Sequence, residues 1–137
     1  MNSLKTQYNL PYDTSGFNSG LINWYNRLIN KSYDELDVID VCKMIRQDVL
    51  KDVAINKAIE IFLKDPYAGE YNDGELLSVF ISLDMKLMDT SSQRELQNIL
   101  ENIQKNQFDF EWDNEKAKAN YVENTDIMLN KLRDTLK

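Results

Sequence analysis

Residues 37–63 have the sequence DVIDVCKMIRQDVLKDVAINKAIEIFL, in which apolar residues recur at intervals of three and four. This spacing places them on one face of an α-helix. The inner face is expected to comprise Val38, Val41, Cys42, Ile45 and Val49, then a new stripe of Ile55, Ala58, Ile59, Phe62 and Leu63. The apolar phase drifts around residues 47–52, so the stretch is either one kinked helix or two helices joined by a short turn. Asp37 is placed to cap its start, and Asp65-Pro66 ends it because proline cannot donate to the helical ladder.

The residues before position 37 are expected to form less regular structure than residues 37–63. Residues 1–18 are expected to form a loose polar segment. An amphipathic helix of about three turns should follow, with the inner residues Leu21, Trp24, Tyr25, Leu28 and Ile29. Ser32 and Glu35 match a capping box, in which each side chain binds the backbone N–H of the other residue. This box would open a short segment from Tyr33 to Leu36.

The C-terminal side predicts three more helices. Asp73 should cap a long central helix whose apolar residues are Leu76, Leu77, Phe80, Ile81, Leu83, Leu87 and Met88. Ser92 and Glu95 form a second capping box for a helix that ends near Asn106. The last helix should begin at Asp113 or Asn114, with the inner residues Tyr121, Met128, Leu129, Leu132 and Leu136. We therefore expect an all-α single domain over residues 1–137, a bundle of about five to seven helices.

The net charge of −7 is concentrated in the second half of the chain. Residues 1–68 hold eight Lys/Arg and nine Asp/Glu, a balance of −1, whereas residues 69–137 hold eight against fourteen, a balance of −6. Direct nucleic-acid binding requires clustered cations, and the sequence has no such stripe. The excess negative charge either attracts a basic protein partner or maintains solubility.

Sequence motifs for catalysis and for cofactor or metal binding are missing. The chain has no histidine, which removes the commonest general base and a common metal ligand. Cys42 falls on an apolar helix face and is expected to be a core residue. None of the four glycines belongs to a phosphate-binding loop, and Gly74 does not fit the sixth position of a calcium loop. We predict a protein that is not an enzyme, with no cofactor and no metal.

The sequence also predicts a compartment. No apolar run approaches the roughly 18 residues that a membrane span requires, and the N-terminus does not resemble an export signal. A single cysteine fits a reducing environment. We expect a cytoplasmic protein that does not bind membranes, and the apolar stripes leave its oligomeric state open.

Two acidic regions are candidate partner-binding sites. The first is the loop between the second and third long helical stretches, with Glu70, Asp73 and Glu75, although acids at a helix start also act as caps. The second is residues 108–113, FDFEWD, in which aromatic and acidic residues alternate. This segment is either a short strand or a lid of three rings with its acids in solvent. Its candidate contacts are Asp109, Glu111, Trp112 and Asp113. Arg46 is expected to form a structural ion pair with one of the loop acids.

Three segments resemble the immunity proteins of contact-dependent growth inhibition systems. They are residues 26–36 (NRLINKSYDEL), 40–47 (DVCKMIRQ) and 65–77 (DPYAGEYNDGELL), and they occur in the order typical of that family. The resemblance covers roughly residues 21–90. It implies a cytoplasmic bacterial protein that binds and neutralises the C-terminal toxin domain of an effector delivered by a neighbouring cell. Such toxins are frequently nucleases with a basic cleft, which an acidic inhibitor could occupy.

Two other functions remain open on the sequence. A helical adaptor or regulatory protein could hold a partner helix in an apolar groove, and its binding would depend little on salt. An enzyme that uses carboxylates alone would lose its turnover when one Asp or Glu is replaced.

Overall fold

The computed structural model describes residues 2–14, 19–69 and 74–136, and these residues form an all-α fold without a β-strand. The helices are α1 Leu4–Gln7, α2 Gly20–Leu28, α3 Val38–Arg46, α4 Lys51–Lys64, α5 Glu75–Phe80, α6 Thr90–Lys105 and α7 Glu115–Thr135. Two 3-10 helices, η1 Tyr33–Glu35 and η2 Met85–Leu87, lie between them. The predicted all-α bundle is confirmed.

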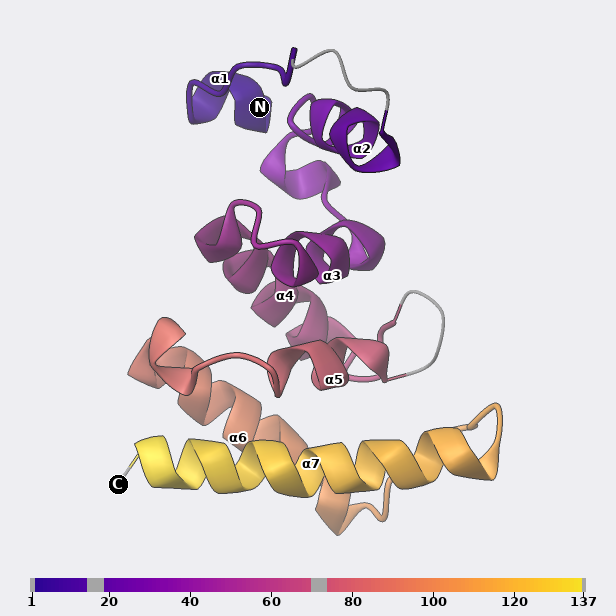
Figure 1. The fold of residues 1–137 in the computed structure, drawn as a ribbon. Coiled ribbons are helices and arrows are strands. Elements are labelled where there is room, and N and C mark those ends of the chain that lie inside the picture. Colours follow the sequence, from indigo (N-terminus) through magenta and orange to yellow (C-terminus); the bar gives the residue numbers. More distant parts are fainter. Residues whose placement is uncertain (1, 15–18, 70–73, 137) are drawn as a thin grey trace.

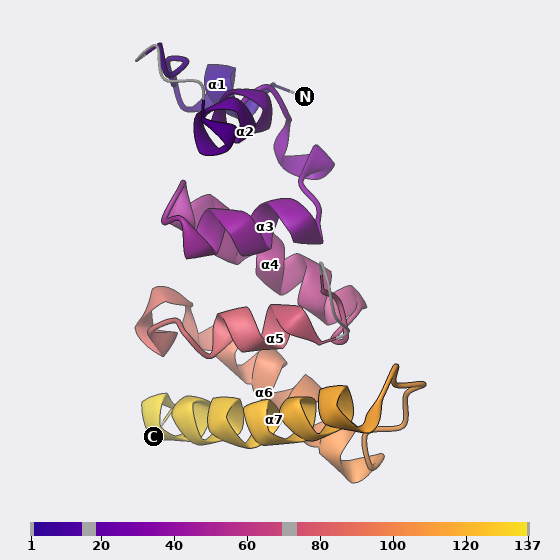
Figure 2. The same ribbon diagram turned by 45° about the vertical axis from the view of Figure 1, so that its right-hand side comes forward.

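The helices are stacked in layers from one end of the molecule to the other (Figure 1). α1 and α2 form one end, α3 and α4 the middle, and α5, α6 and α7 the other end, so that the two termini lie far apart. Figure 2 shows the same order from a second direction. α3 packs along α4, α4 contacts α5 and α6, and α7 lies against α5, α6 and η2. The buried apolar side chains of these layers join in one core.

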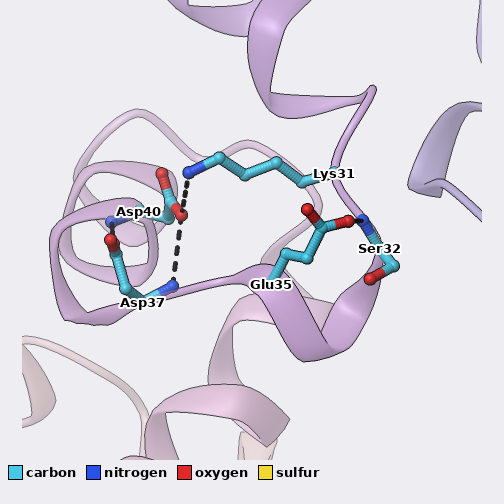
Figure 3. Close-up of polar contacts among 5 residues, drawn as sticks. All are labelled: Lys31, Ser32, Glu35, Asp37 and Asp40. Carbon is cyan, nitrogen blue, oxygen red and sulfur yellow. Dashed lines mark hydrogen bonds and ion pairs between the residues drawn. The ribbon is translucent and has the colours of Figure 1, made fainter.

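The two predicted caps around residues 32–40 are confirmed (Figure 3). The Ser32 N–H donates to Glu35 Oε1 at 3.0 Å. Asp37 Oδ1 accepts from the Asp40 N–H at 2.9 Å, and Asp40 Oδ2 accepts from the Asp37 N–H at 3.1 Å. Lys31 Nζ also donates to Asp40 Oδ2 at 2.8 Å. These contacts fix the chain where it passes from the α2 layer to α3 (Figure 3).

The start of the chain is more ordered than we expected. Leu4, inside the segment predicted to be loose, is fully buried, and the Leu4 N–H donates to the Lys31 carbonyl oxygen at 2.8 Å. One apolar side chain and a few backbone hydrogen bonds therefore hold α1 against the end of α2.

Between α3 and α4 the chain makes a short turn, not a kink. Asp48 and Leu50 both have positive φ angles, 55° and 47°. Two such residues within three positions are incompatible with a continuous right-handed helix. The predicted end at Asp65-Pro66 is confirmed, because α4 ends at Lys64.

The predicted long central helix over residues 73–88 is wrong, because α5 ends at Phe80. Beyond Phe80, three backbone carbonyls accept hydrogen bonds from side chains of other elements. Lys131 Nζ of α7 donates to the Ile81 carbonyl oxygen. Gln93 Nε2 of α6 donates to the carbonyl oxygens of Met85, at 3.0 Å, and Met88, at 2.9 Å. Leu87, one of the apolar residues assigned to that helix, is 45% exposed.

The cap predicted at Ser92 is also wrong. Asp89 caps α6, and its Oδ1 accepts from the Ser92 N–H at 2.7 Å. Ser92 therefore lies in the first turn and supplies a donor to the cap.

The predicted core positions of Trp24 and Cys42 are confirmed, since they are 8% and 0% exposed. Among the helices described, none is both long and apolar enough to cross a bilayer.

The capping carboxylates predict acid sensitivity. Hydrogen bonds from Ser32 lower the pKa of Glu35 below its ordinary value of 4.5, and those from Ser92 lower the pKa of Asp89 below 3.8. A carboxylate with a lowered pKa in the fold stabilises the protein above its ordinary pKa, and this stabilisation is lost as the pH falls through the folded-state pKa. We expect Glu35→Gln with Asp89→Asn to flatten the fall in unfolding free energy between pH 5 and roughly pH 2. Urea unfolding at several pH values measures it, and an unchanged slope would contradict the assignment.

Candidate functional site

Five aromatic rings pack together where the loop after α4 meets the link between α6 and α7. This aromatic cluster consists of Tyr67, Phe108, Phe110, Trp112 and Tyr121. Tyr67 is stacked on Phe110 with ring centroids 4.1 Å apart, and Trp112 meets Tyr67 edge-on at 5.3 Å. Trp112 and Tyr121 are 5.2 Å apart. Such pairs add stabilisation beyond the apolar area that they bury.

Residues 108–113 form a lid of rings, one of the two alternatives expected from the alternating sequence. Phe108, Phe110 and Trp112 are partly buried in the aromatic cluster, whereas Asp109, Glu111 and Asp113 are exposed. The segment turns sharply after α6 because Gln107 and Phe108 have positive φ angles of 60° and 56°. Three carboxylates therefore project from the outer side of a packed aromatic platform.

The α4–α5 loop is held against α7 by Tyr121. The Tyr121 hydroxyl donates to the Pro66 carbonyl oxygen at 2.8 Å, and the Gly74 N–H donates to the Tyr67 carbonyl oxygen at 2.6 Å. Gly74 has a φ of 78°, and a Cβ atom there would lie 2.4 Å from Tyr121 Cδ2. A glycine is required for both reasons. Burial raises the pKa of Tyr121 far above its ordinary value.

Glu75 forms an ion pair with a neighbouring helix. Arg46 Nη2 of α3 lies 2.5 Å from Glu75 Oε1, and the Glu75 side chain is 10% exposed. This confirms the expected structural pairing of Arg46 with a loop acid. Gly74, not Asp73, is the N-cap residue of α5. Glu70 and Asp73 lie outside the described residues.

An open pocket of about 410 Å³ lies between α5 and the N-terminal half of α7. Its lining residues are Gly74, Glu75, Ser78, Asn114, Lys116, Ala117, Asn120, Tyr121 and Asn124. The N-terminal ends of α5 and α7 lie at the same side of the molecule, on the right of Figures 1 and 2. Glu75 of one predicted acidic region therefore borders the pocket from α5. Asp113 of the other region directly precedes the lining residue Asn114, the N-cap residue of α7.

Sequence reasoning missed the polar lining from α7. Asn120 and Asn124 lie four residues apart, a spacing that places them on one face of α7, and Asn114 is the N-cap residue of the same helix. The prediction for this helix concerned only its apolar stripe. The signal was therefore present, but only the packing of α5 against α7 shows that this face lines a pocket.

The electrostatics of the region are acidic. Burial, and then the negative charge of Asp109, raise the pKa of the Tyr67 hydroxyl above its ordinary value. Asp109 is therefore near enough to the aromatic cluster to act on it. Within the described ranges, no three Cys, Asp or Glu side chains are grouped so that they could hold a metal ion.

Comparison with protein families identifies the family of the chain. The model of the CDI immunity proteins, the contact-dependent growth inhibition family, matches residues 8–99, about two thirds of the chain. The chain belongs to this family. It is an immunity protein that neutralises a CDI toxin. No match was found among curated proteins. The α5 wall of the pocket lies inside the matched residues, whereas residues 108–113 and all of α7 lie beyond them.

Proposed function

We propose that this CDI immunity protein neutralises a nuclease toxin by covering the basic cleft of its C-terminal toxin domain, in the cytoplasm of the cell that makes it. A nuclease attracts phosphates with cationic side chains, and an acidic surface is complementary to them. The single observation that carries this proposal is the row of exposed carboxylates Asp109, Glu111 and Asp113 on the aromatic cluster. Because Phe110 and Trp112 are packed against Tyr67, the segment that carries the carboxylates is anchored before binding, and anchoring of this kind lowers the entropy cost of forming a complex.

The alternative function is less well supported. A helical adaptor would require an apolar groove wide enough for a partner helix. The pocket between α5 and α7 is lined mainly by carboxamide, hydroxyl and charged side chains. It does not offer such a groove.

Neutralising the three carboxylates tests the proposal. We expect Asp109→Asn, Glu111→Gln and Asp113→Asn together to weaken binding to the toxin domain encoded immediately upstream by about tenfold or more at low salt, and to reduce its salt dependence. Association and dissociation rates at low and raised salt measure it. Protection of nucleic acid from cleavage by the toxin should fall in parallel.

The matched control removes the same charge elsewhere. Asp34→Asn, Asp52→Asn and Glu95→Gln change three exposed acids outside this site. We expect the affinity of this control to stay within about threefold of the wild-type value, because salt screens charges that lie far from the binding surface. An equal loss in both variants would mean that only net charge matters. Strong binding by the wild-type protein that does not respond to salt would favour the adaptor function.

A further inference from the structure

The pocket between α5 and α7 differs in chemistry from the acidic row beside it. Asn120 and Asn124 contribute carboxamides from α7, and Ser78 contributes from α5. Across the parts of the chain that the structure describes, neither carboxamide makes a hydrogen bond to another residue. Each one offers two N–H donors and a carbonyl acceptor, so the pocket presents both kinds of hydrogen-bonding group.

The charges at the pocket do not select a cation. Glu75 is its carboxylate, and the Arg46 guanidinium pairs with it from α3. Lys116 adds a positive charge to the lining. A lysine or arginine of the toxin that entered the pocket would meet the Lys116 ammonium, and the charge of the Glu75 carboxylate is already balanced by Arg46. The lining is better matched to uncharged polar groups.

The walls of the pocket are fixed by contacts on both sides. Tyr121 is 2% exposed, and its ring lies against the backbone of Gly74. The Thr125 hydroxyl donates to the Tyr121 carbonyl oxygen at 2.8 Å, and the Ser78 hydroxyl donates to the Glu75 carbonyl oxygen at 2.6 Å. A partner entering this pocket does not need to pay for ordering these walls.

We infer that this pocket receives an uncharged polar loop of the toxin, bound through its main chain and short polar side chains, and thereby determines which toxin is recognised. The inference rests on the proposed function, in which the acidic row of Asp109, Glu111 and Asp113 attracts the basic cleft of the toxin. The two surfaces have different roles. Exposed charges accelerate association with any basic partner. Hydrogen-bonding groups that a partner covers without offering a donor or acceptor to them weaken the complex, and so disfavour that partner.

Kinetics of binding test the inference with paired substitutions on α7. The probe is the upstream-encoded toxin domain, inactivated by substitution of a catalytic residue. We expect Asn120→Leu with Asn124→Leu to raise the dissociation rate about tenfold to a hundredfold, since leucine removes hydrogen bonds and leaves the toxin's polar groups unpaired. The association rate and its salt dependence should change less than about twofold, because no charge is altered.

The matched control is Asn98→Leu with Asn130→Leu. These asparagines are exposed on α6 and α7 and do not line the pocket. The control should leave both rates unchanged. A dissociation rate in the pocket variant equal to the wild-type rate overturns the inference while leaving the proposed function intact. Absence of wild-type binding, in contrast, overturns the proposed function and the inference together.

A second measurement identifies the occupant without depending on the leucine variants. A photo-cross-linking amino acid at position 120, in an otherwise wild-type chain, should capture a toxin peptide rich in Ser, Thr, Asn, Gln or Gly. Capture of a peptide centred on Lys or Arg overturns the assignment, because the pocket would then serve charge recognition. Failure to capture any toxin peptide, with binding intact, also overturns it.

Discussion

Replacing Tyr121 by alanine is expected to lower the free energy of unfolding by about 3–5 kcal/mol, the usual cost of removing a large buried aromatic side chain. The ring is 2% exposed and contacts Tyr67, Phe108 and Trp112. Its loss would leave a cavity between the α4–α5 loop and the lid of residues 108–113. Urea unfolding followed by circular dichroism measures the change.

Tyr121→Phe separates the ring from its hydroxyl. This variant keeps the packing and removes only the hydrogen bond to the Pro66 carbonyl oxygen, so we expect a loss of about 1 kcal/mol. The fold also raises the pKa of Tyr121 above its ordinary value of 10.0. The neutral Tyr121 hydroxyl therefore contributes its full stabilisation of the protein below pH 10.0, and this stabilisation declines at higher pH. The phenylalanine variant should lose less stability above pH 10 than the wild type. Similar losses for the two substitutions would show that the ring contributes little.

Gly74→Ala is expected to destabilise the protein by about 2–5 kcal/mol. The left-handed conformation at φ 78° costs a residue with a Cβ about 1–2 kcal/mol. The new methyl group would also meet the Tyr121 ring at 2.4 Å, and overpacking of this kind costs about 1–3 kcal/mol. Binding of the toxin should weaken as well, because Gly74 and Tyr121 form one corner of the pocket.

Gly20→Ala provides the matched control for Gly74→Ala. Gly20 begins α2, and a Cβ atom there would meet nothing within 4 Å. We expect it to be neutral or to stabilise by about 0.5 kcal/mol, since alanine loses less backbone entropy on folding than glycine. Equal effects at the two positions would contradict the role that we assign to the Gly74 backbone.

Prediction from the sequence succeeded where one short segment contains all the interacting groups. Ser32 with Glu35, and Asp37 with Asp40, bind each other across three residues, and both interactions formed. The end of α4 before Pro66 depends only on the missing proline N–H. Family membership was also readable, because its motifs lie in residues 26–77, inside the matched region.

Prediction failed where groups distant in sequence compete for the backbone. α5 ends at Phe80, and the carbonyls of Ile81, Met85 and Met88 beyond it accept hydrogen bonds from side chains of α6 and α7. At the start of α6, Asp89 and Ser92 are both residue types that are preferred at a helix N-cap. They are three positions apart, and the Asp89 carboxylate caps the helix by accepting a hydrogen bond from the Ser92 N–H.

The sequence by itself determined the helical class, the buried positions of Trp24 and Cys42, the family and the acidic character of the second half. It also determined the start of α3, the end of α4, the end of α6 and the start of α7. Each of these follows from local spacing, composition or motif order. Only the tertiary structure decided that Glu75 lines a pocket together with Asn114, the residue that follows the acidic segment 108–113. Pro66 and Tyr121 are 55 residues apart, yet one hydrogen bond joins them. Contacts between such distant residues depend on how whole helices pack, and the pattern of any single segment does not contain that information.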